Sequence, residues 1–339
     1  MDISIVHHYS VSLGRGGEKM ITSIVHELES RGHSVSVYAL PLRRGGAGVA
    51  IRKYRERLFS FVRSDVVYYI YVPLIRRLFP TKSPKIAGVH SFAPFLKFGH
   101  EPVGFFQLLR KHGPLATAAV LYTRLTKNRE LHSYDAVHIP NVVLPEPLGV
   151  RTYLIPNWVD TSVFKLGTKD DVFTVLYVGS RAWSKGFDIF YNVASRLSKI
   201  IPARFVAVGV GGGSGGVVET HPYVSDVEKL AGIYSGAHLL LHPTRADIFG
   251  VTLLEAMASG TPVLTSALPS HLAFVPRWHT CSSTQCYVEK TVEIYKMWAD
   301  RTGEYEALVD TSLRIAKKFD KEKVFPQFEK MLIEVARCR

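Results

Sequence analysis

The sequence contains few cysteines, which limits how the chain can be stabilised. Only three occur in 339 residues, Cys281, Cys286 and Cys338. Disulfide-stabilised secreted domains usually carry an even and much denser set. We therefore expect reduced, buried thiols and a cytoplasmic location. A metal site formed by Cys281, Cys286 and His279 is the alternative that the spacing leaves open.

A long apolar run is also missing. No stretch reaches the roughly 18 uninterrupted apolar residues of a membrane-spanning helix. The first residues, Met1–Val6, begin with an acid and run directly into a strand pattern, unlike a secretory signal. Hydrophobic residues make up 47% of the chain and charged residues 21%, so full hydrophobic cores can form. At this length we expect two domains of ordinary size.

Acidic residues are scarce in one region. Residues 42–130 contain 17 Lys or Arg and 4 Asp or Glu, an excess equal to the net charge of +13. The densest basic runs, Arg52–Arg57 and Arg76–Arg77, are interleaved with Tyr, Leu and Phe. This composition predicts a peripheral contact with an anionic membrane surface, at its inner face. A solvated basic face is the equal alternative. No recognised nucleic-acid module is present, so no nucleic-acid partner is expected.

Strand-length apolar runs alternate with helical periodicity along the whole chain, which favours an α/β fold with parallel sheets. Ile3–His7 is expected to form a strand, and a helix should bury one face of residues 20–28. Phe173–Gly179 opens a second unit of the same kind, and Arg204–Val208 forms its next strand. A C-terminal helical segment, 311–338, should break at Pro326. The loop before the first helix carries three glycines, Gly14, Gly16 and Gly17.

The segment Asp247–Gly260, D-I-F-G-V-T-L-L-E-A-M-A-S-G, is the most informative part of the sequence. It predicts a loop acid, a turn at Gly250, and a helix that carries Glu255 and ends at Gly260 with a left-handed cap. The N–H groups at a helix start bind anions. Two acids flanking such a site suit an elongated ligand with hydroxyls at both ends and phosphate between them, such as a nucleotide-sugar. A core helix with two incidental acids is the alternative.

This segment also resembles the E-x-x-x-x-x-x-x-E signature of retaining glycosyltransferases, in particular family 4 of the GT-B fold. The first acid is Asp247, whereas the family usually has Glu there, which is one methylene longer. Four further elements occur in the family's order. These are Gly16–Glu18, Glu29–Val35, Ile155–Asp160 with Trp158 in place of the family's Gly, and Val178–Gly186.

The resemblance implies a GT-B fold, in which two Rossmann-like domains face one another across a cleft. We expect an N-terminal acceptor-binding domain over residues 1–166 and a nucleotide-sugar-binding domain over 167–315. Residues 316–339 would form a C-terminal helix that crosses back to the first domain.

The same resemblance implies the residues of the site. Lys185 and Arg181 would stabilise the leaving diphosphate, although the family often places these cations further apart than four residues. Asp247 would bind hydroxyls of the transferred sugar and Glu255 those of the ribose. His90, which follows a predicted strand, would contact the donor sugar and position the acceptor. The predicted catalytic residues are thus His90, Arg181, Lys185 and Asp247. The predicted donor-binding residues are Gly16, Gly17, Arg181, Lys185, Asp247, Ile248, Phe249, Gly250, Val251 and Glu255.

Each of these side chains also has an ordinary structural alternative. Arg181 and Lys185 could be surface residues of a loop, and His90 could be a satisfied core histidine. His7 and His8 also stand at the end of a predicted strand. They would either line the acceptor side or have a structural role. The base of the nucleotide is expected near Pro222–Ser225, largely through main-chain contacts.

We therefore expect a retaining hexosyltransferase for glycan biosynthesis, with a nucleoside diphosphate sugar as donor and a glycan or lipid-linked acceptor. No D-x-D element is present, so no metal or other cofactor is expected. A GT-B nucleotide-sugar epimerase and a non-catalytic sugar-nucleotide-binding protein are the alternatives. An NAD-dependent dehydrogenase is disfavoured, because Gly14, Gly16 and Gly17 do not form G-x-G-x-x-G.

Overall fold

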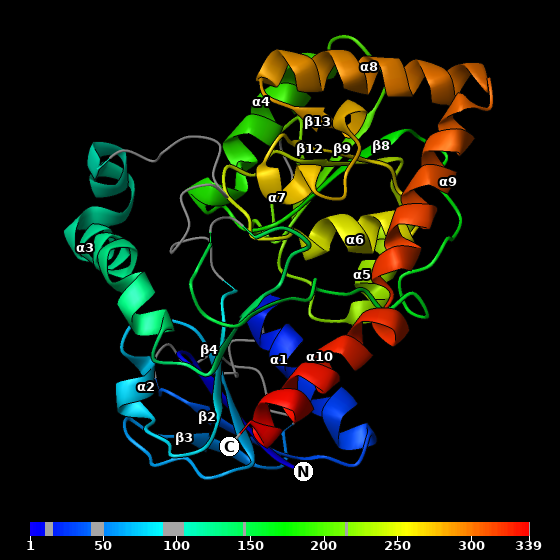
Figure 1. Cartoon of the computed structure of the whole chain (residues 1–339). Coiled ribbons are helices and arrows are strands. Elements are labelled where there is room, and N and C mark those ends of the chain that lie inside the picture. Colours follow the sequence, from blue (N-terminus) through cyan, green and yellow to red (C-terminus); the bar gives the residue numbers. More distant parts are fainter. Residues whose placement is uncertain (11–15, 42–50, 91–104, 145–146, 214–215, 339) are drawn as a thin grey trace. The chain divides into compact units, whose positions relative to one another are not determined.

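The computed structural model (Figure 1) describes residues 1–10, 16–41, 51–90, 105–144, 147–213 and 216–338. Its contacts divide the chain into two compact units. Unit 1 holds the described residues up to Ile155 together with those from Phe325 onward, and unit 2 holds Pro156–Val324.

Unit 1 is built on a seven-stranded sheet in the order β3-β2-β1-β4-β5-β6-β7. All neighbouring strands are parallel. Because β2 and β3 lie on one side of β1 while β4 lies on the other, the strand order reverses between β1 and β4. The strands are β1 (Asp2–His7), β2 (Ser34–Ala39), β3 (Tyr54–Glu56), β4 (Val66–Ile70), β5 (Lys85–Gly88), β6 (Ala136–Ile139) and β7 (Thr152–Leu154).

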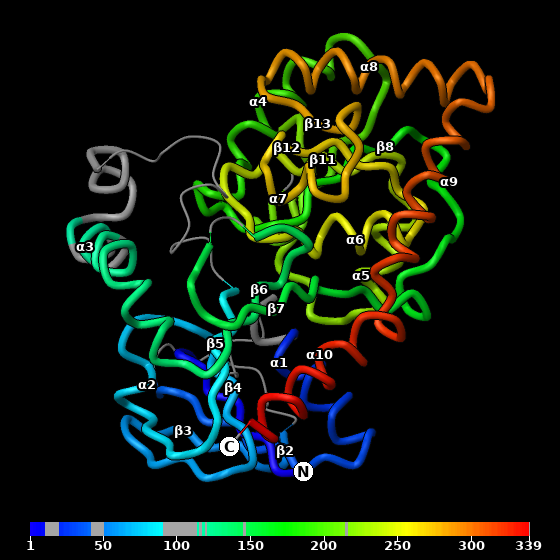
Figure 2. Tube along the Cα trace, viewed as in Figure 1, coloured from blue at the N-terminus to red at the C-terminus, as the bar shows by residue number. Residues whose placement is uncertain are grey.

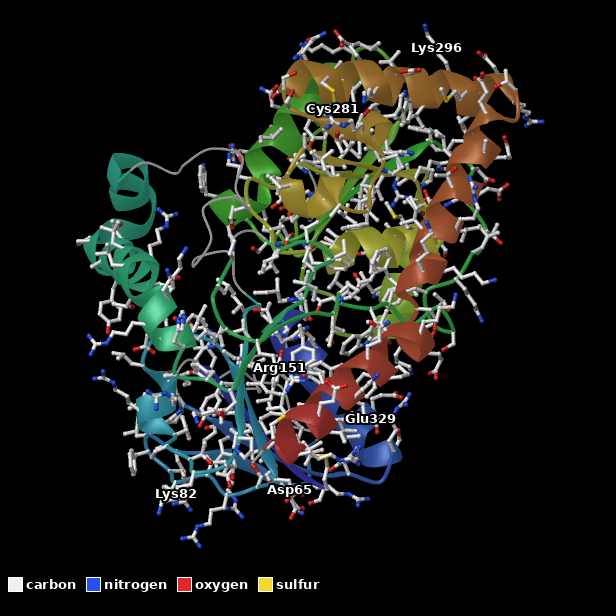
Figure 3. All side chains as sticks on the ribbon, in the orientation of Figure 1. Asp65, Lys82, Arg151, Cys281, Lys296 and Glu329 are labelled. Carbon is white, nitrogen blue, oxygen red and sulfur yellow. A yellow bond between two sulfur atoms is a disulfide. The ribbon has the colours of Figure 1, made fainter. Side chains whose placement is uncertain are left out.

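Helix α1 of unit 1 packs against β2 and buries an apolar face. On α1 the buried side chains recur at helical spacing, as the sequence predicts: Ile21, Ile24, Val25 and Leu28. The C-terminal part of α10 also belongs to this unit. Figure 3 labels Glu329 on α10, whose carboxylate binds Arg31 at 3.2 Å and His33 at 2.7 Å. The helices are α1 (Gly16–Ser30), α2 (Ile75–Leu78), α3 (Phe105–Leu131) and α10 (Lys321–Arg337).

Unit 2 contains a six-stranded sheet in the order β10-β9-β8-β11-β12-β13. Every neighbouring pair is again parallel. The order reverses between β8 and β11, the two central strands labelled in Figure 2. These two sheets confirm the α/β class and the two Rossmann-like units expected from the sequence. The strands are β8 (Thr174–Val178), β9 (Arg204–Val208), β10 (Glu219–His221), β11 (Leu239–His242), β12 (Val263–Ser266) and β13 (Thr280–Cys281).

Helices cover both faces of the unit 2 sheet. On one face, Phe190 of α4 and Tyr287 of α8 join alternate strand residues such as Val175 and Leu241 in a continuous core. On the other face, α6 packs beside α5 and α9. The helices are α4 (Phe187–Leu197), α5 (Val227–Gly236), α6 (Val251–Ala258), α7 (Pro269–Leu272), α8 (Thr284–Asp300) and α9 (Glu304–Ala316), with short 3-10 helices at Trp183–Lys185, Arg277–His279 and Lys317–Phe319.

The ends of α6 are those that the sequence predicts. Gly250 precedes the helix with φ of 92°, and Gly260 follows it with φ of 71°, a conformation that favours glycine. The amides of Gly260 and Thr261 close the last turn by bonding to Met257 and Ala256 carbonyls at 3.1 and 2.9 Å.

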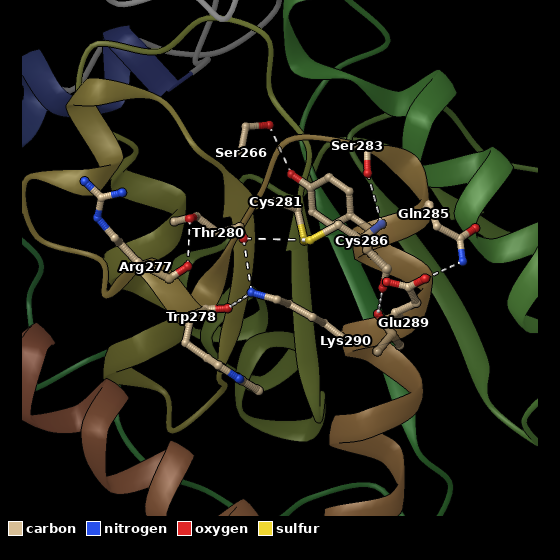
Figure 4. Close-up of a disulfide and its surroundings, with 12 residues drawn as sticks. Ser266, Arg277, Trp278, Thr280, Cys281, Ser283, Gln285, Cys286, Glu289 and Lys290 are labelled. Atoms are coloured by element: carbon tan, nitrogen blue, oxygen red, sulfur yellow. Dashed lines mark hydrogen bonds between the residues drawn. A yellow bond between two sulfur atoms is a disulfide. The ribbon is translucent and has the colours of Figure 1, made fainter.

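The expectation of reduced thiols is wrong for two of the three cysteines. Cys281 at the end of β13 and Cys286 in the first turn of α8 form a disulfide, with Cα atoms 5.6 Å apart (Figure 4). The short turn between strand and helix brings the two residues within bridging distance. The same bond excludes the alternative of a metal site formed by Cys281 and Cys286, and the cysteines no longer indicate a reducing compartment.

The predicted break at Pro326 is also wrong. Pro326 lies inside α10, and the helical segment is interrupted at Asp320, where the backbone is extended. Asp320 pairs with Val159 in an isolated parallel bridge, and its carboxylate accepts from the Glu322 amide at 2.8 Å. These contacts end one helix and cap the next, so the break follows from tertiary pairing.

None of the helices within the described ranges combines the length and apolar character needed to cross a bilayer.

Candidate functional site

The loops that follow β8 and β11 lie against each other at the point where the strand order of unit 2 reverses. Parallel α/β sheets bind ligands at such points, beyond the carboxyl ends of the strands. Gly186 ends the first loop with φ of 73°, and a Cβ added there would overlap the carbonyl oxygen of Pro243 in the second. A glycine is therefore required for this close approach.

Arg245 connects the two loops by hydrogen bonds. Its amide donates to the Ser184 carbonyl at 2.7 Å, and its guanidinium donates to the Trp183 carbonyl at 2.8 Å. The same guanidinium forms a bidentate pair with Asp188 at 2.7 and 2.8 Å and lies over the Trp183 ring. Arg245 was not among the predicted residues, although it lies two residues before the predicted acid Asp247.

This arrangement brings two of the predicted residues together. The Lys185 ammonium lies 3.1 Å from Asp247 Oδ2, and the lysine side chain is 36% exposed whereas the Asp247 side chain is 13% exposed. Burial would raise the pKa of Asp247, but Lys185 and the neighbouring histidines hold it well below its usual range. Asp247 is therefore a carboxylate at neutral pH, with its charge balanced by a cation that still reaches solvent.

Two buried histidines that were not among the predicted residues lie beside Asp247. His242 ends β11 with Nε2 3.4 Å from Asp247 Oδ2. His271 in α7 has its Nδ1 2.8 Å from Thr265 Oγ1. Burial lowers the pKa of His242, and it lowers the pKa of His271 to about 3, so both rings are neutral at pH 7. A histidine at the end of an otherwise apolar strand was the signal available for His242.

His242, Asp247 and His271 form the group of residues in the described chain that could hold a metal ion. One ligand atom of each lies within 4.8 Å of the others. Two imidazoles and a carboxylate are a donor set that zinc accepts. However, Asp247 Oδ2 already binds the Lys185 ammonium at 3.1 Å, so a metal ion there would share that oxygen with a positive charge.

The other predicted residues of unit 2 fall into three kinds of environment. Glu255 lies in α6, where Tyr234 donates to its Oε2 at 2.8 Å. Phe249 is fully buried and stacks on Phe274, and Ile248 is also buried, so these two can offer only main-chain groups to a ligand. Gly250 is the N-cap of α6 and Val251 is its first residue, and the first amides of a helix have no partner within it.

Arg181 does not join the Lys185–Asp247 pair. Its Nε donates to the Val210 carbonyl at 2.6 Å, and its guanidinium lies over the Phe187 ring at 5.0 Å. Pro222–Ser225, the predicted base-binding segment, follows β10 and is largely exposed.

In unit 1, Gly16 and Gly17 form the start of α1, whereas Gly14 lies outside the described residues. His90 follows β5, and its Nε2 is 2.7 Å from the Tyr68 hydroxyl. His7 ends β1 with its Nδ1 2.7 Å from the Tyr9 carbonyl, and its ring lies 4.6 Å from that of His8.

Comparison with known sequences identifies part of the chain. Residues 172–289, which include both loops and α6, match the family described as "Glycosyl transferases group 1". D-inositol 3-phosphate glycosyltransferase 1 of Catenulispora acidiphila is 29% identical over 150 residues, which cover 35% of this chain and 36% of that protein. The chain spans about a third of the length of the curated relatives it matches.

Solved structures resemble the whole chain. Sucrose-phosphate synthase from Thermosynechococcus elongatus gives a TM-score of 0.70 at 17% identity and covers 99% of both chains. Anabaena HepE, in complex with UDP and glucose, gives 0.69 at 14% identity and covers 98% of this chain and 100% of that one. These likenesses confirm the GT-B fold that the sequence resemblance implies.

The buried His271 predicts a pH dependence of stability. Its folded pKa of about 3 lies below the value of about 6.5 for an unfolded chain. Its contribution is therefore fully present above pH 6.5 and is lost as the pH falls toward 3. The wild type should lose about 1.4 kcal/mol more of its unfolding free energy per pH unit than His271→Gln over this window.

Urea denaturation followed by tryptophan fluorescence measures this difference, because all four tryptophans belong to unit 2. The exposed Ile200 of the same unit, changed to Gln, is the control and should leave the slope unchanged. Equal slopes for the wild type and His271→Gln would contradict the assignment of a buried neutral imidazole.

Proposed function

We propose that this chain, a GT-B protein with a group 1 glycosyltransferase domain in residues 172–289, transfers a sugar from a nucleoside diphosphate sugar to an acceptor, with retention of configuration and without a metal. The observation that carries this proposal is the Lys185–Asp247 pair, which lies between the β8 and β11 loops and directly before α6. At this pair, a cation that reaches solvent and a carboxylate lie next to the N-terminus of a helix.

Stabilisation of the leaving diphosphate would come from Lys185 and α6. Negative charge develops on the diphosphate as the bond from sugar C1 to the phosphate oxygen breaks. A nearby ammonium and helix N–H groups favour that charge more in the transition state than in the ground state. Lys185 is suited to this because it is partly exposed, while Asp247 restrains its position. Arg181, exposed on the same loop, is the candidate for a second cation.

The two acids would bind hydroxyl groups on either side of the diphosphate. Glu255 is oriented by the Tyr234 hydroxyl and would accept from the ribose. Asp247 would accept from the transferred sugar. Its side chain is one methylene shorter than the usual Glu, and the contact with His242 at 3.4 Å holds it back toward β11. We therefore propose that Asp247 contacts a sugar hydroxyl directly only when the bound sugar lies close to the β11 loop.

The reaction would proceed on one face of the sugar. The acceptor oxygen bonds to C1 on the side from which the diphosphate departs, and its proton passes to the departing phosphate oxygen. Asp247 is poorly suited to act as a covalent nucleophile, because its carboxylate is already bound by Lys185 and His242. HepE, which shares the fold, binds UDP and glucose, which supports a sugar nucleotide as the donor here.

The acceptor is proposed to lie at an anionic membrane, on the cytoplasmic side, as a lipid-linked glycan would. Unit 1 exposes a basic and apolar face, defined by Leu58, Phe59, Phe61, Arg63, Arg77, Leu78 and Lys82. Main-chain bonds from Ser60 to Leu78 and from Val62 to Pro80 hold its two segments side by side. Leu58 is 67% exposed and Phe59 63%. Exposed apolar side chains flanked by arginine and lysine fit a surface of anionic lipid.

Replacement of Lys185 tests the catalytic proposal. Lys185→Ala removes the cation nearest to the departing diphosphate, and kcat should fall by about 10²- to 10³-fold. Turnover is measured with a panel of nucleoside diphosphate sugars, by release of the nucleoside diphosphate. The exposed Lys199, changed to Ala, is the matched control on the same unit and should keep wild-type turnover.

Unchanged turnover in Lys185→Ala would remove this residue from the reaction. Formation of an epimerised sugar in the absence of any acceptor would instead identify an epimerase.

Removal of metal tests whether the His242–Asp247–His271 group serves the reaction. Because Lys185 already neutralises Asp247, turnover after dialysis against EDTA should stay within about twofold of the untreated rate. Loss of activity that a divalent ion restores in the wild type, but not in His271→Gln, would assign a catalytic metal to these residues and contradict the proposal.

Liposome flotation tests the membrane face. The wild type should float with vesicles containing phosphatidylserine at low salt and less so at high salt, because screening weakens the basic contacts. The double change Leu58→Glu and Phe59→Glu should abolish flotation, whereas Leu166→Glu and Ile200→Glu on unit 2, both 56% exposed in the wild type, should not. Equal flotation of both variants would exclude this face as the contact.

A further inference from the structure

A buried chain of hydrogen bonds links β6 and β4 of unit 1 and ends at His90, which follows β5. His138 in β6 has its Nε2 2.8 Å from the Ile155 carbonyl and its Nδ1 2.6 Å from the Tyr68 hydroxyl. The same hydroxyl, on β4, lies 2.7 Å from His90 Nε2. Tyr68 is fully buried and His138 is 1% exposed, so no solvent competes for these groups.

The proton positions along this chain follow from its first member. A carbonyl oxygen can only accept, so His138 Nε2 must carry a proton to bond to Ile155. Burial lowers the pKa of His138 to about 4, so the ring is neutral and its Nδ1 is an acceptor. Burial also raises the pKa of Tyr68 well above its usual value, so the hydroxyl keeps its single proton.

The hydroxyl proton of Tyr68 therefore goes to His138, and it cannot also be given to His90. His90 Nε2 must then donate to the Tyr68 oxygen. Burial, together with His138 and His7, holds the pKa of His90 well below its usual value, so this ring is neutral too. A neutral imidazole protonated at Nε2 carries a lone pair at Nδ1. Within the described part of the chain, no residue donates to that nitrogen.

We propose that Tyr68 and His138 are positioning residues, which hold His90 in the Nε2-protonated form and present its Nδ1 as an acceptor for a substrate hydroxyl. This rests on the proposed function for the identity of that hydroxyl, which belongs to the donor sugar or to the acceptor. Because its Nε2 proton is already given to Tyr68, His90 can act toward a substrate only as a hydrogen-bond acceptor.

Packing around the chain maintains this arrangement. A Cβ added to Gly88 would overlap the Tyr68 hydroxyl, so glycine is needed where β5 passes it. On the other side, the ring of Phe328 in α10 lies 5.2 Å from Tyr68 and 5.5 Å from His138. The tyrosine therefore has little room to rotate away from either histidine.

Nitrogen-15 NMR of the histidine rings tests the proposal independently of activity. In the wild type, His90 should show a protonated Nε2 and an unprotonated Nδ1. Tyr68→Phe removes the acceptor for Nε2, and both nitrogen signals should shift toward values for mixed tautomers. Tyr69→Phe is the matched control, because it removes a buried hydroxyl from the same strand that bonds to the Phe79 carbonyl at 2.6 Å and touches neither histidine. His90 protonated at Nδ1 in the wild type, or unmoved in Tyr68→Phe, would overturn the proposal.

Kinetics show which hydroxyl His90 binds. Tyr68→Phe should lower kcat by about tenfold relative to Tyr69→Phe, the loss expected for one misdirected hydrogen bond. A loss in both donor hydrolysis and transfer places the hydroxyl on the sugar, and a loss in transfer alone places it on the acceptor. Unchanged rates in an active enzyme would overturn the role in catalysis.

Two further outcomes keep the inference separate from the proposed function. A wild type that shows the expected tautomer but no transfer with any donor would refute the glycosyltransferase proposal and leave the positioning by Tyr68 standing. If Tyr68→Phe does not fold, His138→Leu tests the same chain of hydrogen bonds. It removes the acceptor for the Tyr68 hydroxyl, whose proton is then free to go to His90, and His90 should again lose its single tautomer.

Discussion

The ion pair between Lys185 and Asp247 is the interaction on which the candidate site depends. The two residues are 62 positions apart and follow different strands, yet they meet at 3.1 Å because β8 and β11 are neighbours at the reversal of strand order. Gly186 allows the loops that follow β8 and β11 to approach closely, and hydrogen bonds of Arg245 connect them. Without a carboxylate at this point a partly buried lysine would lose its restraint, and without the lysine a buried charge would be left unpaired.

Both units place polar side chains at or beyond the carboxyl ends of parallel strands. In unit 2 the pair lies beyond β8 and β11, and in unit 1 His7 and His90 lie at or just beyond the ends of β1 and β5. A buried neutral histidine lies close to these groups in each unit, His271 near Asp247 and His138 near His90. Such rings orient a carboxylate or a second imidazole without adding charge, which suits sites that must hold a polar ligand in a fixed direction.

Several helices and strands could be predicted from the sequence, because they depend on local periodicity. The strand at residues 204–208, the buried face of α1 and the capped ends of α6 follow from apolar spacing and glycine positions. The resemblance also pointed to Lys185, Asp247 and Glu255 together. The features that could not be predicted from the sequence depend on contacts between distant segments. Tyr68 lies within an apolar run, and nothing in the sequence indicates its hydrogen bond with His90. Asp320 interrupts a helix only because Val159 pairs with it. The Cys281–Cys286 bridge depends on how β13 turns into α8.

The most direct test of the central claim is the binding of nucleoside diphosphates by calorimetry, with UDP, GDP, ADP and dTDP titrated into the wild type and into Lys185→Gln. We expect at least one diphosphate to bind the wild type and to bind Lys185→Gln at least about tenfold more weakly, since a charged hydrogen bond is worth about 1.5–3 kcal/mol. No binding by any of the four, or equal affinity for the two proteins, would contradict a diphosphate site at the Lys185–Asp247 pair.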